Sequence, residues 1–220
     1  MLPQFNNPLL LDTALTHRSA LNENISPAAE SYERLEFLGD AVLELITTEF
    51  LFEKLAHEPE GTLTAYRSAL VKTTTLAEVA TALGLGQKLY MSKGEESTGG
   101  RNNAGLLADT TEAVLGAIYL DQGYEAAKHF LEKNLFDKFE QIKEQKLYLD
   151  AKSQLQEIVQ SKGFEAPTYQ VTKEEGPDHD KQFTVEVFFD SQSKGIGNGK
   201  SKQLAQQAAA QAALRVLADT

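Results

Sequence analysis

The 220-residue sequence contains no cysteine, no apolar run of about 20 residues and no excess of basic side chains. Without cysteine the chain cannot form disulfides, a thiolate zinc site or a cysteine nucleophile. Because it also lacks a long apolar run and a basic, apolar leader, we expect a cytoplasmic protein with no membrane partner. Hydrophobic residues still make up 41% of the chain and charged residues 24%, which is typical of a folded globular protein.

The deficit of basic residues is confined to the first two thirds of the chain. In total, 21 Lys and Arg stand against 32 Asp and Glu, which gives a net charge of −11. Residues 151–220 hold 8 basic and 9 acidic side chains, which leaves 13 and 23 for residues 1–150. Taken alone, this acidity argues against nucleic acid, because cations that neutralise phosphates supply much of the binding free energy there.

The spacing of the apolar residues changes where the charge does. Up to about residue 145 they recur with the period of a helix, which predicts an all-α domain over residues 1–145. Beyond it the pattern predicts a helix at 153–162, strands near 169–171, 183–189 and 194–197, and an Ala-rich helix at 200–217. The predicted fold is therefore an all-α domain followed by a smaller α+β domain, in the order α-β-β-β-α, over residues 151–218.

One predicted helix, residues 33–45, carries acids along a single face of an otherwise apolar surface. Because a helix turns by about 100° per residue, the acids fall within a sector of about 80°. They are Glu33, Glu36, Asp40 and Glu44. The remaining positions, including Phe37 and Leu45, are apolar, so we expect most of this helix to lie in the core.

A second predicted helix, residues 106–121, repeats this design. Its acids Asp109 and Glu112 share a face by their i, i+3 spacing, and its other residues are mostly apolar. Carboxylates that are partly withdrawn from water need a compensating cation. Oxygen ligands without His or Cys favour Mg²⁺, Mn²⁺ or Ca²⁺ over zinc.

Composition and spacing leave two interpretations of these acids open. They are either the solvated faces of amphipathic helices or the ligands of a metal site. A glycine inside each helix, Gly39 and Gly116, favours the second interpretation slightly. Glycine costs about 1 kcal/mol relative to alanine in a helix, so it usually marks the close approach of another element or a ligand.

Four segments of residues 1–145 resemble the landmarks of a known family. They are YERLEFLGDAVLEL at 32–45, ALTHRSA at 14–20, RSALVKTTTLAEVA at 67–80 and LLADTTEAVLGAIYLD at 106–121. In sequence, order and spacing they resemble the endonuclease domain of bacterial ribonuclease III. The first of these segments is highly specific, and the resemblance extends over essentially the whole chain.

The resemblance implies a particular active site. The family's four metal-binding acids correspond to Glu36, Asp40, Asp109 and Glu112, of which we expect Asp40 and Glu112 to be catalytic. Glu60 matches a further acid implicated in the family's cleavage site. The implied cofactor is Mg²⁺, with Mn²⁺ as a substitute.

The resemblance also implies a reaction and a partner. A homodimer would hydrolyse both strands of double-stranded RNA by two-metal-ion catalysis. The products would have 5′-phosphate and 3′-hydroxyl ends with short 3′ overhangs. The family expectation for substrates is precursors of ribosomal RNA and other structured RNA.

The C-terminal sequences LQEIVQ, GPDHDKQFTVEV and GNGKSKQLAQQAAAQAAL resemble a double-stranded RNA-binding domain. Such domains read the A-form shape across two minor grooves and the phosphates of the major groove between them. The positions implied to touch RNA are Gln156 and Gln160 in the first helix, His179 between two strands, and Lys200, Ser201 and Lys202 before the last helix. The family often has a second lysine where this chain has Gln203, so we expect weak, salt-sensitive binding.

Three other functions fit the sequence less well. The GNGKS segment resembles the end of a phosphate-binding loop, but Lys194 stands where that motif requires glycine, so no nucleotide cofactor is expected. A catalytically silent RNA-binding relative would normally lose one of the four acids, and all four are present. An acidic helical scaffold for other proteins would leave the second domain unexplained.

Overall fold

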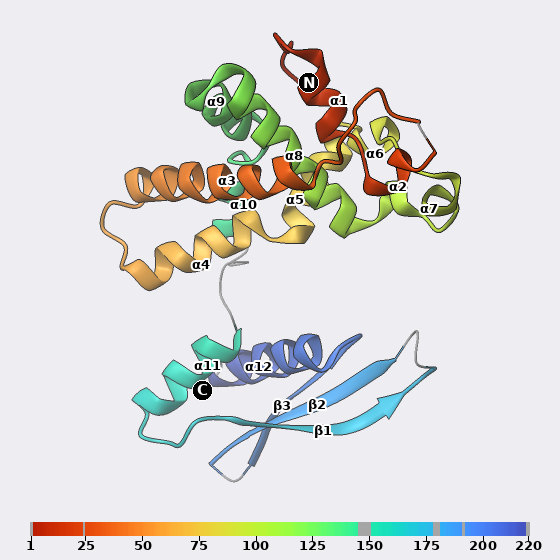
Figure 1. Cartoon of the computed structure of the whole chain (residues 1–220). Coiled ribbons are helices and arrows are strands. Elements are labelled where there is room, and N and C mark those ends of the chain that lie inside the picture. Colours follow the sequence, from red (N-terminus) through yellow and green to blue (C-terminus); the bar gives the residue numbers. More distant parts are fainter. Residues whose placement is uncertain (1, 24, 145–150, 178–180, 191, 219–220) are drawn as a thin grey trace. The chain divides into compact units, whose positions relative to one another are not determined.

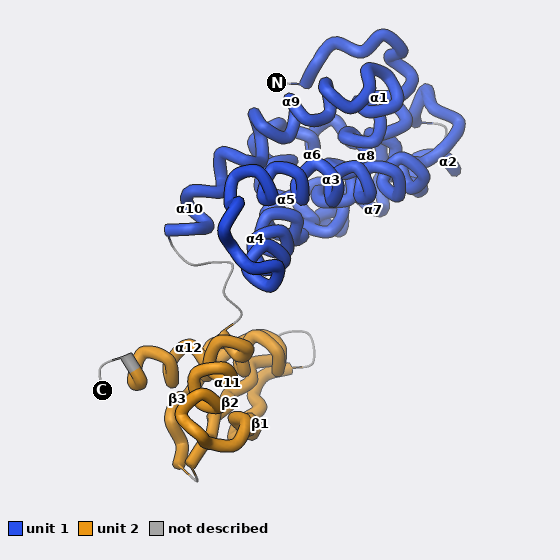
Figure 2. Tube along the Cα trace, turned by 90° about the vertical axis from the view of Figure 1, so that its left-hand side faces the viewer, with its two compact units in different colours: residues 1–148 blue, residues 149–220 orange. Residues whose placement is uncertain are grey.

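The computed structural model describes residues 2–23, 25–144, 151–177, 181–190 and 192–218. The chain divides into two compact units, Met1–Tyr148 and Leu149–Thr220, coloured separately in Figure 2. Each unit has its own hydrophobic core. The first is built from helices and the second from helices and an antiparallel sheet (Figure 1). The predicted fold class is therefore confirmed.

The described part of the first unit consists of short and long helices. In chain order they are α1 (Pro8–Ala14), α2 (Arg18–Leu21), α3 (Glu33–Lys54), α4 (Glu60–Val71), α5 (Thr73–Ala82), α6 (Leu85–Lys88), α7 (Lys93–Ser97), the 3₁₀ turn η1 (Gly100–Asn102), α8 (Ala104–Gln122), α9 (Tyr124–Asn134) and α10 (Lys138–Glu144). The longest two, α3 and α8, form the centre of the unit and pack against each other more extensively than any other pair (Figure 1).

Two glycines allow α3 and α8 to touch backbone to backbone. A Cβ atom added to Gly39 of α3 would lie 1.8 Å from the Glu112 carbonyl oxygen of α8. A Cβ atom added to Gly116 of α8 would lie 2.3 Å from the Leu35 carbonyl oxygen of α3. No side chain fits at either distance, so the close approach predicted from these glycines is confirmed.

The expectation that most of α3 lies in the core is wrong for one face of the helix. Phe37 is 82% exposed and Leu45 is 60% exposed, and Ala41 between them is also exposed. Only the opposite face, which includes Val42 and Ile46, is buried against neighbouring helices. A helical spacing of apolar residues indicates that one face of the helix is buried. It does not indicate whether that face is buried by the same chain or by another one.

The second unit has the order α11 (Ala151–Ser161), β1 (Thr168–Glu175), β2 (Gln182–Phe189), β3 (Gln192–Gly199) and α12 (Lys202–Ala218). Its strands form an antiparallel sheet in the order β1-β2-β3. Val171 of β1 pairs with Val185 of β2, which in turn pairs with Gly197 of β3. Both helices cover one face of the sheet (Figure 1).

Glycines and alanines bring α12 close to β3. A Cβ atom at Gly197 would lie 2.1 Å from the backbone nitrogen of Ala209, which is fully buried. The two layers therefore pack with little side-chain volume between them. A Cβ atom at Gly199 would lie 2.6 Å from the backbone nitrogen of Ala205, so the end of β3 also packs closely against the first turns of α12, where the predicted RNA-binding lysines lie.

Candidate active site

Two of the predicted acids lie near the start of α3, which is anchored by an upstream segment. The backbone N–H of Tyr32, at the N-terminal end of α3, donates to the Thr16 carbonyl over 2.9 Å. The Tyr32 ring lies 5.9 Å from the ring of His17. These contacts fix the first turns of the helix, which carry Glu36 and Asp40.

The other two predicted acids lie near the start of α8. The side chain of Asn103 caps this helix by accepting from the backbone N–H groups of Gly105 and Leu106, at 2.9 and 3.2 Å. Asp109 and Glu112 follow on the next turns and are half-buried. The glycine contact between the helices places the Glu112 backbone directly against α3.

The electrostatics show that the crossing brings the four acids near one another. Burial raises the pKa of Glu112 to about 7, with further contributions from the carboxylates of Asp40, Glu36, Asp109 and Glu44. Burial also raises the pKa of Glu36, assisted by the charges of Asp109, Glu33 and Asp40. For Asp109, burial raises the pKa against its own backbone hydrogen bond and the charge of His17. A raised carboxylate pKa means that negative charge lacks compensation here.

The donor set fits a hard divalent cation in ligand type and charge. All four side chains offer carboxylate oxygens, and the repulsion between them would be relieved by a cation that they share. Within the described ranges, no three His, Asp or Glu side chains are gathered tightly enough to hold a metal ion as they stand.

The fifth predicted acid, Glu60, lies on another helix. It is the first residue of α4, is exposed, and accepts a hydrogen bond of 2.9 Å from the Thr64 hydroxyl. It lines a groove between α3 and α4 together with Arg67. The α3 residues that line this groove include Thr48 and Phe52, and none of the four acids of the α3–α8 crossing lines it.

Sequence reasoning missed an ion pair in the same region. Nε of Arg67 in α4 lies 2.9 Å from Oε2 of Glu44 in α3. Glu44 stands one turn after Asp40 on the acidic face, so its place in that 80° sector was the available signal. The partner of Glu44 comes from a different helix, and no spacing rule within one helix could identify it.

The predicted RNA-binding residues of the second unit lie at both helices. Gln156 and Gln160 are exposed, one turn apart on α11. Lys200 is exposed before α12, and the Ser201 hydroxyl accepts from the Leu204 N–H over 3.2 Å at the start of the helix. The ammonium group of Lys202 lies 5.7 Å from the ring centroid of Phe183 in β2. His179 lies outside the described residues.

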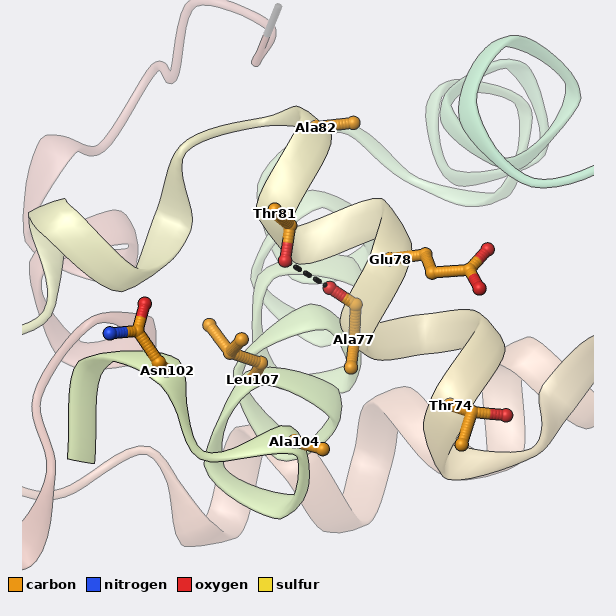
Figure 3. A pocket seen from close by; sticks show the side chains of 8 residues that line it. All are labelled: Thr74, Ala77, Glu78, Thr81, Ala82, Asn102, Ala104 and Leu107. Atoms are coloured by element: carbon orange, nitrogen blue, oxygen red, sulfur yellow. Dashed lines mark hydrogen bonds between the residues drawn. The ribbon is translucent and has the colours of Figure 1, made fainter. Parts of the chain in front are cut away.

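Another hollow lies between α5 and the start of α8 and contains none of the predicted site residues (Figure 3). Its wall includes Ala77 and Leu107. The carboxylate of Glu78 at its edge is paired with Lys138, 2.5 Å away. The Thr81 hydroxyl in its wall donates to the Ala77 carbonyl. Because the Glu78 carboxylate and the Thr81 hydroxyl already have partners, this hollow is a weaker candidate than the carboxylate cluster.

Comparison with known proteins gives matches over both units. A ribonuclease-III-like family model matches residues 7–139, and a double-stranded RNA binding motif matches residues 151–217. Ribonuclease 3 of Geobacillus kaustophilus is 47% identical over 213 residues, which are 97% of this chain and 86% of that protein. Ribonuclease 3 of Chloroflexus aggregans is 47% identical over 212 residues, or 96% and 91% of the two chains.

Solved structures agree. The nuclease domain of ribonuclease III from Campylobacter jejuni, described as having structural flexibility in a region involved in dimer formation, is 41% identical with a TM-score of 0.57. That likeness covers 62% of this chain and 91% of the Campylobacter chain. Dicer from Pichia stipitis is 29% identical with a TM-score of 0.50, and the likeness covers 97% and 96% of the two chains.

The fold, the carboxylate cluster and these matches define a metal-dependent endoribonuclease that acts on double-stranded RNA. The near-full-length identity to curated relatives makes the family unambiguous. The chain belongs to the ribonuclease III family. None of the helices in the described part of the chain is long and apolar enough to cross a membrane.

Proposed function

We propose that Glu36, Asp40, Asp109 and Glu112 form the active site and bind Mg²⁺, with Mn²⁺ as a substitute. The observation that carries this proposal is the backbone contact of α3 and α8 at Gly39, which brings two pairs of half-buried or exposed acids from distant parts of the chain together. A cluster of uncompensated carboxylates is costly for a protein with only a structural use for it.

The proposed chemistry is hydrolysis of a phosphodiester bond. Two Mg²⁺ ions would supply Lewis acidity and an activated water for in-line attack. The chain would contribute ligand oxygens from two helices whose backbones are in contact, and the side chains would close around the cations when these bind. Glu112 must lose its proton to act as a ligand, and its raised pKa makes that loss depend on the cation. We assign Asp40 and Glu112 as catalytic, and Glu60 as an additional acid at the cleavage site.

We assign residues 1–145 to the endonuclease domain and 151–218 to the double-stranded RNA-binding domain. Residues in the second domain proposed to contact RNA are Gln156, Gln160, His179, Lys200, Ser201 and Lys202. The exposed glutamines suit the hydroxyl groups of a minor groove. The lysines at the start of α12 suit phosphate, because a helix N-terminus favours anions. The first domain is acidic and would repel RNA without metal.

The active form is proposed to be a homodimer, with one active site for each strand. The proposal is supported by the exposed apolar face of α3. Leu120 of α8, which is 55% exposed, extends this apolar surface, because it lines the same hollow as Phe37. Two sites on a symmetric dimer would cut both strands of a duplex and leave short 3′ overhangs, with 5′-phosphate and 3′-hydroxyl ends. We propose a cytoplasmic location and precursors of ribosomal and other structured RNA as substrates, which are the expectations that the sequence resemblance carries.

The experiment uses a paired RNA of several helical turns, labelled on one strand and then on the other. It is incubated with the purified protein and Mg²⁺, Ca²⁺ or a chelator. The proposal expects Mg²⁺-dependent, staggered cuts in both strands, with 5′-phosphate products. Intact RNA under every condition, together with a retarded band on a native gel, would instead identify a binding protein whose carboxylates are unused.

A further inference from the structure

The groove between α3 and α4 is the place where a cation meets the acidic face of α3. It encloses about 170 Å³. Residues in its wall include Thr48, Phe52, Glu60, Leu63, Thr64 and Arg67. The Arg67 guanidinium is the cationic group among these residues.

Two side chains of α3 hold Arg67 at this position. Its Nε atom lies 2.9 Å from Oε2 of Glu44, and one of its terminal amino groups donates to the Thr48 hydroxyl over 3.0 Å. Thr48 is itself fixed, because its hydroxyl donates to the Glu44 carbonyl over 2.6 Å. These two contacts use two of the five N–H groups of a guanidinium. The Arg67 side chain is 35% exposed, so solvent or a ligand can reach it.

Glu44 connects this ion pair with the active site. It lies one helical turn after Asp40 on the acidic face of α3, and its charge is among those that raise the pKa of Glu112. If the RNA strand follows the acidic face of α3, the phosphate next to the cleaved one lies near Glu44. The Glu44 carboxylate alone would repel that phosphate. Arg67 cancels this charge in the free protein.

We infer that Arg67 is an RNA-positioning residue of the endonuclease domain. In the free protein it neutralises Glu44, and on binding it turns its guanidinium toward a phosphate adjacent to the one that is cleaved. Arginine suits this role, because its planar fork can exchange a carboxylate for a phosphate with similar geometry. This inference rests on the proposed function only for the location of the scissile phosphate.

The test measures RNA affinity as a function of salt. All variants are made in the Glu112→Gln background, so that the paired RNA is not consumed, and binding is measured in Mg²⁺ from about 50 to 200 mM KCl. Arg67→Gln is expected to weaken RNA binding about three- to ten-fold. It should also make the plot of log association constant against log salt concentration less steep, by about one unit of slope. Arg67→Lys keeps the charge and should keep most of the slope.

Glu44→Gln is expected to change RNA affinity in the opposite direction. It releases Arg67 from its partner, so RNA should bind several-fold more tightly, and most of this gain should vanish in the Arg67→Gln, Glu44→Gln double variant. The control pair is Lys138→Gln and Glu78→Gln, which breaks an ion pair of 2.5 Å that does not line the groove. Substitutions at Lys138 and Glu78 should change RNA affinity less than those at Arg67 and Glu44. Their effects in the double variant should be additive.

Three results would overturn the inference. The salt slope of Arg67→Gln could equal that of its parent, Glu44→Gln could bind RNA more weakly, or the gain from Glu44→Gln could persist without Arg67. A purely structural ion pair would lower the melting temperature of the variants and leave the slope unchanged. The proposed function is tested separately by cleavage with the unaltered chain. If that chain does not cut RNA and the slope still changes, the inference stands as one about binding.

Discussion

At the scale of the residue, Glu112 shows how the fold makes a carboxylate depend on its surroundings. Its pKa rises from 4.5 to about 7 because burial and the neighbouring acids disfavour its charged form. The folded state therefore binds a proton that the unfolded state has already lost between these two values. Metal-free protein should lose stability as the pH rises through this window.

Glu112→Gln should remove this loss of stability at high pH, because glutamine has no proton to lose in this range. Without divalent cations, the variant should be more stable than the parent at pH 8, by about 1–2 kcal/mol after allowance for solvent screening, and equal to it near pH 4. Urea unfolding of both proteins at the two pH values measures the difference. A gain of the same size at pH 4 would show that the carboxylate charge is not its cause.

Cation binding should act on the same residues. Mg²⁺ added to the parent should raise its melting temperature more at pH 8 than at pH 5, because at the lower pH the cation must displace protons from Glu112 and its neighbours. Differential scanning fluorimetry checks this, with Asp40→Asn as the comparison that should respond less. An equal rise at both pH values, or an undiminished rise in the variant, would place the cation elsewhere.

At the scale of the element, the crossing of α3 and α8 is the feature on which the site depends. A methyl group at Gly39 would collide with the backbone of Glu112. Gly39→Ala should therefore lower the free energy of unfolding by about 3 kcal/mol or force the helices apart. The matched control is Gly61→Ala in α4, where an added Cβ atom meets nothing within 4 Å.

Thermal unfolding of both variants tests this claim. Gly61→Ala should be neutral or slightly stabilising, because alanine is the better helix former. If Gly39→Ala unfolds like the parent and keeps full cleavage activity, the close contact is not needed to place the four acids.

The helices that carry the site could be predicted because their signals are local. Periodicity, the acidic faces and the two internal glycines all lie within single segments. The Arg67–Glu44 pair could not be predicted in this way, since it joins α4 to α3 over 23 positions of sequence. The start of α12 was predicted at Lys200, whereas the helix begins at Lys202, because the Ser201 hydroxyl serves as its cap.

At the scale of the whole molecule, the exposed face of α3 is where prediction from the sequence erred. Phe37 and Leu45 carry the apolar pattern of core residues, yet within a single chain they face solvent. The pattern reports only that a surface is apolar, and a partner chain satisfies it as well as a neighbouring helix does. We therefore attribute the stripe of Phe37, Ala41 and Leu45 to the proposed dimer.

Phe37→Asp should convert the dimer to a monomer, because it places an uncompensated charge in an apolar contact. Analytical ultracentrifugation over a range of concentrations measures the change. Ile196→Glu is the control, since Ile196 is also an exposed large apolar residue, at 57%, but lies in the second unit. A parent that sediments as a monomer, or a Phe37→Asp variant that remains a dimer, would contradict the assignment.

The central claim is that the four carboxylates at the α3–α8 crossing cut double-stranded RNA. The most direct test compares the single-turnover rate of cleavage of a paired RNA in Mg²⁺ by the parent and by Glu112→Gln, with RNA affinity measured in parallel. Loss of about 4 kcal/mol of transition-state stabilisation predicts a variant that is about 1,000-fold slower. Its RNA affinity should persist. Equal cleavage rates for parent and variant would contradict the account.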